Sequence, residues 1–408
     1  FVCCFFWGET LTFIENVNMQ FITLLAVFAA LCVFANAQVL PPYTEDCQHG
    51  MYANHARCAG MPPTFEVNLD QDPSVRWNGV VQHKKKELVA MIGQIKLLVG
   101  AISPKIITAV DQYLPELIQK LPEPYGAEIQ GIAKASGLPD GEILLFNIFY
   151  EIFTVCTSIV AQDDAGKLYH ARNLDFGLFM GWDVKNHTWL ITEYLRPLVV
   201  NVNFTRGGKT AYKSVNFAGY IGLLTGIKPN AFTITLNERF NIDGGFVGML
   251  EWIMGQRDGH WTSFLTRTVM DKASSYDEAM SMLTKEVILA PVYYIVGGVK
   301  SGEGAVVTRD RTKLDNVMAM NTTAGEWYVL ETNYDNWTNP PFFDDRRADA
   351  KKCMDYSGKK GVGFPSIFDV LSTKPVLNQL TTYTALMQVN AGTLETYIRE
   401  CPHPCYPW

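Results

Sequence analysis

Apolar residues recur every three or four positions between residues 84 and 155, a spacing typical of amphipathic helices. Pro104 interrupts the pattern, the Pro122-Glu123-Pro124 turn interrupts it again, and Gly137 marks a further stop. Asp140 is a residue type that often precedes a helix as its cap. We therefore predict helices over residues 84–103, 106–120 and 125–136, and a fourth from Asp140 to residue 153. The proline-rich residues 38–83 are expected to be irregular.

Near residue 155 helical spacing gives way to short runs of residue types that favour strands. Residues 156–162 and 167–173 are two such runs, and Asp163-Asp164-Ala165-Gly166 between them is typical of a turn. A hairpin is therefore predicted to begin at Cys156. Further strands are predicted at 190–193, 214–217, 231–236, 293–297, 305–308 and 327–332, and helices at 246–254, 261–270 and 276–286.

Strands grouped with separate helices predict a layered α+β fold, in which one sheet packs on another and helices lie outside. The chain is 48% hydrophobic and 18% charged, which is enough apolar material for a sizeable core. Its formal net charge is -7 and no basic stripe occurs, so nucleic acid is not an expected partner. In an acidic compartment the chain turns net positive and is attracted to anionic lipid surfaces.

The amino-terminal segment resembles a secretory signal. We expect residues 1–18 to be an upstream translation artefact, Met19 to be the start, and residues 19–37 to be a signal peptide. An apolar run over 21–34, too short to span a membrane comfortably, ends in Ala35-Asn36-Ala37, a typical cleavage site. The region before the run carries no Lys or Arg. A buried amino-terminal helix is the alternative.

Entry into the secretory pathway predicts glycans and disulfides. Four N-x-[ST] sequons are candidate glycosylation sites, at Asn186, Asn203, Asn321 and Asn336. Six cysteines follow the predicted signal peptide: Cys47, Cys58, Cys156, Cys353, Cys401 and Cys405. The last two would close a small terminal loop. Spacing alone leaves the pairing of the others open.

Several familiar kinds of catalytic site are missing from the sequence. The seven histidines form neither an HExxH motif nor a Cys/His set with metal-ligand spacing, so no metal site is expected. The glycines over 297–304 lack the Lys-Ser/Thr of a phosphate-binding loop and are typical of a hairpin turn. No G-x-S-x-G motif occurs. No cofactor is therefore expected.

The predicted hairpin carries the remaining candidates for chemistry. Cys156 begins one strand, and Arg172 and Asp175 lie on the return strand. Taken alone, these residues favour a structural interpretation. A cysteine on a strand is usually a small buried hydrophobe, and an Arg-x-x-Asp is usually an ordinary ion pair.

The wider sequence changes that interpretation. The Cys-Thr-Ser-Ile-Val run at 156–160 and the Arg-Asn-x-Asp at 172–175 resemble the signature of the acid ceramidase and N-acylethanolamine acid amidase family of N-terminal-nucleophile hydrolases. The terminal cysteine pair is more similar to the ceramidase branch. The resemblance spans most of the chain and extends to residues 44–47, 236–240, 289–291, 301–304, 308–311, 332–337, 344–347, 371–378 and 401–405.

The resemblance implies an αββα sandwich preceded by a helical amino-terminal subunit. A precursor cut between Val155 and Cys156 would yield a helical alpha subunit, 38–155, and a catalytic beta subunit, 156–408. The Cys156 thiol would be the nucleophile, and its freed α-amine would be the base, so that no histidine is needed. The matching positions imply that Arg172, Asp175 and Asn333 are catalytic, the last as an oxyanion donor. They imply a supporting role for Arg346 and a substrate-lining role for Glu238, for which pairing with Arg239 is the alternative.

By the same match, Cys47 would pair with Cys353 and join the two subunits, and Cys401 would pair with Cys405. Cys58 departs from the family pattern, so a Cys47–Cys58 disulfide is a rival.

The implied activity is that of a lysosomal, or alternatively secreted, amidohydrolase. It would cleave ceramide to sphingosine and a fatty acid through a thioester acyl-enzyme. It would work at the membrane surface, with or without a lipid-presenting activator protein. The apolar residues 144–155 are either a buried core helix or a segment whose release opens an acyl channel. The alternatives are an amidase that acts on N-acylethanolamines and, from another class, a non-catalytic lipid-binding glycoprotein.

Overall fold

The computed structural model describes residues 44–102, 114–148, 154–177, 181–239, 245–341 and 344–405. The predicted signal peptide lies outside these ranges, as do residues 106–113 and 149–153 of two predicted helices. In the described part of the chain, no helix is both long enough and apolar enough to cross a bilayer.

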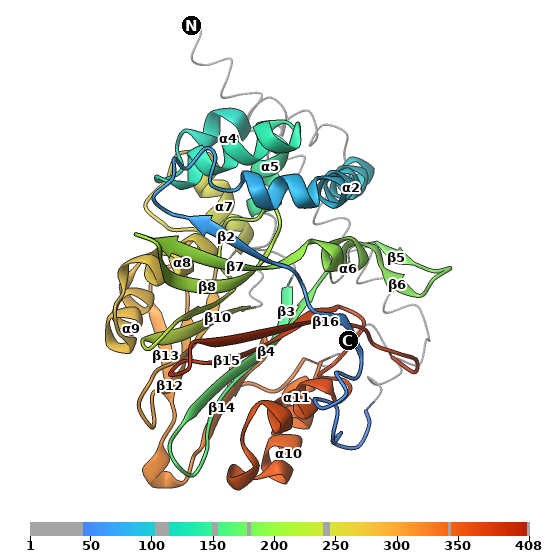
Figure 1. Cartoon of the computed structure of the whole chain (residues 1–408), viewed down its shortest axis with the longest axis vertical. Helices are drawn as coiled ribbons and strands as arrows, with labels where there is room; N and C mark the ends of the chain where they lie inside the picture. The colour runs from blue at the N-terminus through green and yellow to red at the C-terminus, as the bar shows by residue number, and fades with distance from the viewer. Residues whose placement is uncertain are drawn as a thin grey trace, which may run out of the picture. The chain divides into compact units, whose positions relative to one another are not determined.

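Two sheets form the centre of the fold (Figure 1). The six-stranded sheet has the order β1 (Cys58–Gly60), β16 (Thr393–Arg399), β15 (Thr381–Gln388), β4 (Leu168–Phe176), β3 (Thr154–Gln162), β14 (Tyr328–Glu331). The eight-stranded sheet has the order β13 (Leu314–Ala319), β12 (Gly304–Arg309), β11 (Val292–Gly297), β10 (Phe232–Glu238), β9 (Thr225–Lys228), β8 (Lys209–Phe217), β7 (Val199–Arg206), β2 (Thr64–Asn68). Adjacent strands are antiparallel, except that β2 is parallel to β7.

Strand β3 is buried along its whole length because both of its faces are covered. Ile159 and Ala161 pack on helices α10 (Arg346–Ser357) and α11 (Phe364–Ser372). Val160, on the opposite face of the strand, packs on the eight-stranded sheet through Tyr293 and Ile295. The predicted packing of sheet on sheet is confirmed, and even-numbered positions of β3 point into the space between the sheets.

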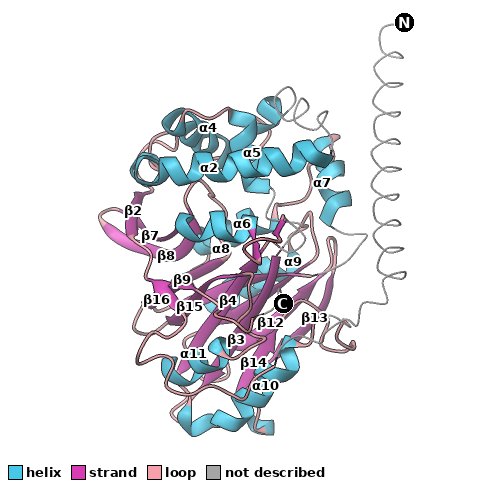
Figure 2. Cartoon of the chain, turned by 90° about the vertical axis from the view of Figure 1, so that its right-hand side faces the viewer, coloured by secondary structure: helices cyan, strands magenta, loops and turns pink. Residues whose placement is uncertain are grey.

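Helices cover the outer faces of both sheets, which completes the predicted αββα layers (Figure 2). The eight-stranded sheet is covered by α8 (Thr262–Lys272) and α9 (Tyr276–Lys285). The described helices of the amino-terminal part include α2 (Asn78–Ile102), α4 (Tyr125–Ser136) and α5 (Asp140–Ile148). Other described elements include α6 (Leu190–Leu195), α7 (Gly245–Ile253) and a small hairpin of β5 (Trp182–Asp183) and β6 (Thr188–Trp189).

The helical predictions for the first part of the chain are confirmed where the structure describes it. Helix α4 ends at Gly137, whose φ of 77° is a conformation that glycine adopts without steric cost. Helix α2 begins at Asn78, six residues earlier than predicted, and Lys84 interrupts its helical geometry. Asp140 is the first residue of α5 rather than its cap.

Two secondary-structure predictions were wrong. Residues 190–193, predicted as a strand, form helix α6, in which Ile191, Thr192 and Leu195 share the buried face. The Thr192 hydroxyl also donates to the Phe176 carbonyl of β4, which anchors this short helix. Residues 38–83 are not wholly irregular, since they contribute strands β1 and β2, one to each sheet.

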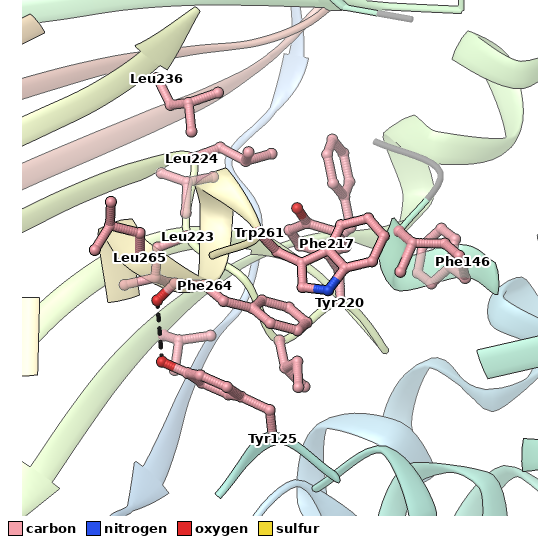
Figure 3. Packing of buried hydrophobic residues seen from close by; sticks show 14 of the residues in the cluster. Tyr125, Phe146, Phe217, Tyr220, Leu223, Leu224, Leu236, Trp261, Phe264 and Leu265 are labelled. Atoms are coloured by element: carbon pink, nitrogen blue, oxygen red, sulfur yellow. Dashed lines mark hydrogen bonds between the residues drawn. The ribbon is translucent and has the colours of Figure 1, made fainter. Parts of the chain in front are cut away.

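An aromatic and aliphatic cluster joins the amino-terminal helices to α8 and the eight-stranded sheet (Figure 3). Tyr125 of α4 stacks on Phe264 of α8 at 4.6 Å between ring centroids, and its hydroxyl donates to the Phe264 carbonyl at 3.0 Å. Phe146 of α5 packs edge-on against Tyr220. Residues on either side of Cys156 in the sequence therefore share one hydrophobic core.

Candidate active site

The β3–β4 hairpin places Cys156 and Arg172 in the space between the sheets. Both residues are fully buried. Nη2 of Arg172 donates to Sγ of Cys156, and its Nη1 donates to the Leu224 carbonyl at 2.7 Å and to the Thr225 hydroxyl at 3.3 Å. These contacts from the second sheet hold the guanidinium against the thiol.

Burial raises the pKa of the Cys156 thiol, because a thiolate loses its hydration there. The positive charge of Arg172 opposes this effect without overcoming it. The thiol is therefore neutral at rest and needs a base before it can act as a nucleophile.

Asn333 follows strand β14 and contacts the backbone of the nucleophile. Its Oδ1 accepts a hydrogen bond from the backbone nitrogen of Cys156 at 2.6 Å, and its Nδ2 donates to the Glu238 carbonyl at 2.7 Å. One amide hydrogen of Asn333 is thus already bound, which leaves one for the oxyanion role implied by the sequence.

Arg346, at the start of α10, connects the other polar groups of the site. It donates to Asp175 Oδ2 at 2.8 Å and to Asn333 Oδ1 at 2.9 Å. Asp344 binds the same guanidinium through both carboxylate oxygens, at 2.8 and 2.7 Å. Arg346 therefore contacts Asp175, Asn333 and Asp344 at once.

The Asp175 carboxylate is held by Arg346 and by Asn378, whose Nδ2 donates to Oδ2 at 3.0 Å. Burial raises the pKa of Asp175, and the charge of Arg346 opposes that shift. At Asp344 the balance is reversed: burial raises its pKa, but Arg346 outweighs burial and the net pKa is lowered. Sequence reasoning gave no role to Asp344 or Asn378, although both lie in segments that carry the family resemblance.

Two buried cations, Arg172 and Arg346, face two buried carboxylates, Asp175 and Asp344. With both carboxylates ionised, these four side chains sum to zero net charge. A proton moved from the thiol to a nearby amine would keep that balance, whereas a proton lost to solvent would leave an uncompensated negative charge.

Glu238, at the end of β10, contacts the residues that precede the nucleophile. Its Oε2 accepts from the backbone nitrogen of Thr154 at 2.6 Å and from the Thr154 hydroxyl at 3.1 Å. Arg239, the alternative partner, forms ion pairs with Asp315 and Asp335. A small pocket adjoins this contact, lined by Thr154, Leu236, Glu238, Thr262, Ala290, Pro291 and Val292.

Val155 and Cys156 lie within one continuous strand, so the structure is that of the uncut chain. Val155 is buried in a cluster with Trp189 and Leu380. Its backbone pairs with Asp175 of β4. The bond before Cys156 is therefore held rigidly beside the thiol, between groups that come from both sheets.

The structure contains disulfides between Cys47 and Cys353 and between Cys401 and Cys405, the pairs that the family match implied. Cys58 is a free thiol, so the rival Cys47–Cys58 bond is not formed.

Among the sequons, Asn186 and Asn321 are exposed, whereas Asn203 and Asn336 are half-buried. Within the described ranges, no group of three or more His, Cys, Asp or Glu side chains is arranged to hold a metal ion.

Comparison with known proteins agrees with this geometry. The family model of linear amide C–N hydrolases of the choloylglycine hydrolase family matches residues 156–365, so the match begins at Cys156. A model of the beta subunit of N-acylethanolamine-hydrolysing acid amidase matches residues 60–121. The acid ceramidase of Mus musculus is 48% identical over 385 residues, which cover 94% of this chain and 98% of the mouse protein.

This chain belongs to the acid ceramidase family. The acid ceramidase of Homo sapiens is 49% identical over 387 residues, again covering 94% of the chain and 98% of the relative. Among solved structures, an N-acylethanolamine-hydrolysing acid amidase ortholog of Caenorhabditis elegans aligns with a TM-score of 0.52 at 33% identity, covering 60% of this chain and all of the nematode chain. The fold is thus that of the N-terminal-nucleophile hydrolases, and the family is one of amidohydrolases.

Proposed function

We propose that this chain is a lysosomal amidohydrolase that cleaves ceramide to sphingosine and a fatty acid. One observation carries the proposal: the Cys156 thiol lies against Arg172, while the backbone nitrogen of the same residue is bound by Asn333. The nucleophile and the future base both belong to Cys156, and a different side chain positions each of them. The relatives named acid ceramidase, similar over nearly the whole chain, support ceramide as the substrate.

The first reaction is self-cleavage. The Cys156 sulfur attacks the Val155 carbonyl carbon, the carbon–nitrogen bond breaks, and the departing nitrogen takes up the thiol proton. Water then hydrolyses the resulting thioester, which yields a Val155 carboxylate and regenerates the Cys156 thiol beside the amine freed in the previous step. Segments 38–155 and 156–408 become the two subunits, and the Cys47–Cys353 disulfide keeps them joined.

The freed amine is the base for turnover. It occupies the position of the former amide nitrogen, beside Asn333 Oδ1. An α-amine has a reference pKa of about 7.7–8.0, and the nearby charge of Arg172 together with burial lowers the amine pKa toward the range needed in an acidic lumen. The amine accepts the thiol proton, and the resulting thiolate and ammonium cancel, so the net charge of the buried site does not change.

The same groups then act on the substrate amide. The thiolate attacks the ceramide carbonyl, and the second Nδ2 hydrogen of Asn333 donates to the developing oxyanion, a contribution of about 2.7–4 kcal/mol to barrier lowering. The Cys156 ammonium returns its proton to the leaving sphingosine nitrogen. A thioester of the fatty acid remains and is hydrolysed by water.

Release of the segment that ends at Val155 makes room for the substrate. In the uncut chain Thr154 donates a hydrogen bond to the Glu238 carboxylate. The side chains of Leu144, Phe146 and Ile148 are buried in the main core. Departure of Thr154 would enlarge the small pocket that Thr154 and Glu238 line together in the uncut chain. Residues 144–148 thus match the buried-helix alternative before cleavage, whereas Thr154 and Val155 belong to strand β3.

A lysosomal membrane is the proposed contact surface, and the mostly polar β5–β6 hairpin beside this site offers it two exposed apolar side chains. Trp189 packs on Val155 and on Trp182, and Trp182 and Val184 of the same hairpin are exposed. A chain with a pI of about 5.6 is net positive in an acidic lumen, which favours anionic lipid surfaces. A lipid-presenting activator protein would serve the same step.

Hydrolysis of N-acylethanolamines is the second candidate function. The nematode structure and the family model over residues 60–121 both carry that name and favour it. The catalytic groups would be the same, so only the fit of the leaving amine separates the two activities. Kinetics on ceramide and an N-acylethanolamine of equal acyl length decide between them. A kcat/KM at least tenfold higher for the ethanolamide would overturn the ceramide assignment.

Self-cleavage is tested by the mass of the reduced chain after incubation at acidic pH, for the wild type and for Cys156→Ala. The proposal expects two wild-type fragments that meet at Cys156 and an intact variant. A wild-type chain that stays whole at every acidity, with no hydrolysis of either substrate, would support the lipid-binding glycoprotein instead.

A further inference from the structure

A row of polar side chains crosses the interior between the two sheets. Burial of polar groups is costly unless each one is hydrogen-bonded, so an unbroken buried row calls for a physical explanation. All of its members are at most 2% exposed. From β3 and β4 it takes Ser158 and His170, and from β10 it takes Thr233, Thr235 and Asn237.

The contacts form a continuous chain. Thr233 Oγ1 lies 2.8 Å from His170 Nδ1, and His170 Nε2 lies 3.0 Å from Thr235 Oγ1. The Thr235 hydroxyl donates to Ser158 Oγ at 2.8 Å, and Ser158 donates to Asn237 Oδ1 at 2.8 Å. The Asn237 amide then donates to two backbone carbonyls, those of Glu331 at 3.1 Å and Thr332 at 3.0 Å.

Counting the available protons gives this row of hydrogen bonds a single direction. The single hydroxyl proton of Thr235 is used on Ser158, so His170 must donate to Thr235 through Nε2. Burial lowers the pKa of His170 to about 3, so the ring is neutral and its Nδ1 is an acceptor. Thr233 therefore donates to Nδ1 rather than to the Gly297 carbonyl 3.2 Å away. Each group then donates to the next, toward Thr332.

The chain ends one residue before Asn333, beyond the last residue of strand β14. Asn333 must place Oδ1 against the Cys156 nitrogen and Arg346 while keeping one Nδ2 hydrogen for the oxyanion. The Asn237 amide fixes the two carbonyls that precede it. A catalytic group displaced by about 1 Å loses on the order of 100-fold in rate.

We propose that His170, Thr235, Ser158 and Asn237 are positioning residues that hold Asn333 in its working geometry through the Glu331–Thr332 backbone. This inference rests on the proposed function of Asn333. In this proposal His170 completes a hydrogen-bond chain in which every group donates in the same direction. It transfers no proton to the substrate.

The test compares two substitutions of buried threonine by valine. Thr235→Val breaks the chain with little change of shape. Thr308→Val, in β12 of the same sheet, is the matched control, because Thr308 is equally buried and its hydroxyl has no hydrogen-bond partner within the described residues. The self-cleavage rate is followed by mass, and kcat and KM are measured on ceramide and on an N-acylethanolamine.

We expect Thr235→Val to slow self-cleavage and lower kcat by about tenfold or more, with KM changed less than twofold. Thr308→Val should leave all three unchanged, and Thr235→Ser, which keeps the hydroxyl, should restore most of the loss. If Thr235→Val does not fold, Ser158→Ala takes its place with the same expected losses.

Equal rates for the folded chain-breaking and control variants would overturn the inference. So would a loss confined to KM, or a loss that Thr235→Ser does not restore. Self-cleavage needs no added substrate. A wild type that cuts itself but hydrolyses neither lipid would therefore refute the substrate assignment alone, and the cleavage rates would still decide the positioning role.

Discussion

Glu331 offers a direct test of how burial sets the charge state near the site. It ends strand β14, two residues before Asn333, and is fully buried. Burial raises its pKa from the ordinary value of 4.5 to about 8. Arg347 lies 3.7 Å from its Oε1, which by itself would favour the ionised form. That guanidinium also donates to the Tyr334 carbonyl at 2.9 Å and lies over the Tyr334 ring, so burial dominates and the carboxyl is neutral.

The sign of the pH effect follows from the raised pKa. Below pH 4.5 Glu331 is protonated in both the folded and the unfolded chain. Between pH 4.5 and about 8 the folded chain keeps the proton and the unfolded chain loses it, so the free energy of unfolding falls as pH rises. Each pH unit in this window removes about 1.4 kcal/mol, and the whole window removes several kcal/mol. The protonated Glu331 therefore makes its full contribution to the free energy of unfolding only at acidic pH.

The assay is urea unfolding at pH 4.5, 6.0 and 7.5, with Cys156→Ala as the parent so that no self-cleavage intervenes. Adding Glu331→Gln replaces the neutral acid by a group of similar shape that cannot ionise. The two chains should be equally stable, within about 1 kcal/mol, at the lowest pH. At pH 7.5 the glutamine variant should be more stable by several kcal/mol.

Glu66→Gln, at an exposed carboxylate of β2, is the control and should leave the pH dependence of the parent unchanged. Parallel stability curves for the parent and Glu331→Gln across this range would refute the reasoning. They would mean that Arg347 keeps the buried carboxyl ionised.

Three further predictions follow from other parts of the molecule. Arg346→Lys should abolish self-cleavage, measured by mass, since an ammonium has three donors and no planar fork and cannot reproduce the four hydrogen bonds that Arg346 makes; wild-type cleavage would contradict this. Arg267→Met should destabilise the fold by about 1.5–3 kcal/mol in urea unfolding, because the buried Glu128 carboxylate then keeps Arg76 and Trp77 as partners but loses its bonds from Arg267, whereas Arg206→Met at an exposed pair should cost under about 1 kcal/mol. Asn186→Gln and Asn321→Gln should each remove one glycan from the mass of the secreted protein, and an unchanged mass would refute its use.

Local sequence determined those features that depend on neighbouring residues. Helical spacing and the stop at Gly137 predicted α4 correctly, because hydrogen bonds within a helix join residues four positions apart. The Asp163–Gly166 turn and its flanking strands predicted the β3–β4 hairpin. That hairpin already places Cys156 and Arg172 near one another. Strands β15 and β16 were not predicted. They pair with one another as a local hairpin, but β15 also pairs with β4 and β16 with β1, and these partners are remote in the sequence.

Only the tertiary structure decided how the remaining charges pair. Asp175 and Arg346 are 171 residues apart, yet they form a fully buried ion pair. Family resemblance named both but said nothing of their contact, and no local rule pointed to Asp344 as the second carboxylate on Arg346. Such pairs are set by the requirement that every charge buried between packed layers meets an opposite charge or a hydrogen-bond partner, and that requirement arises only once the layers close.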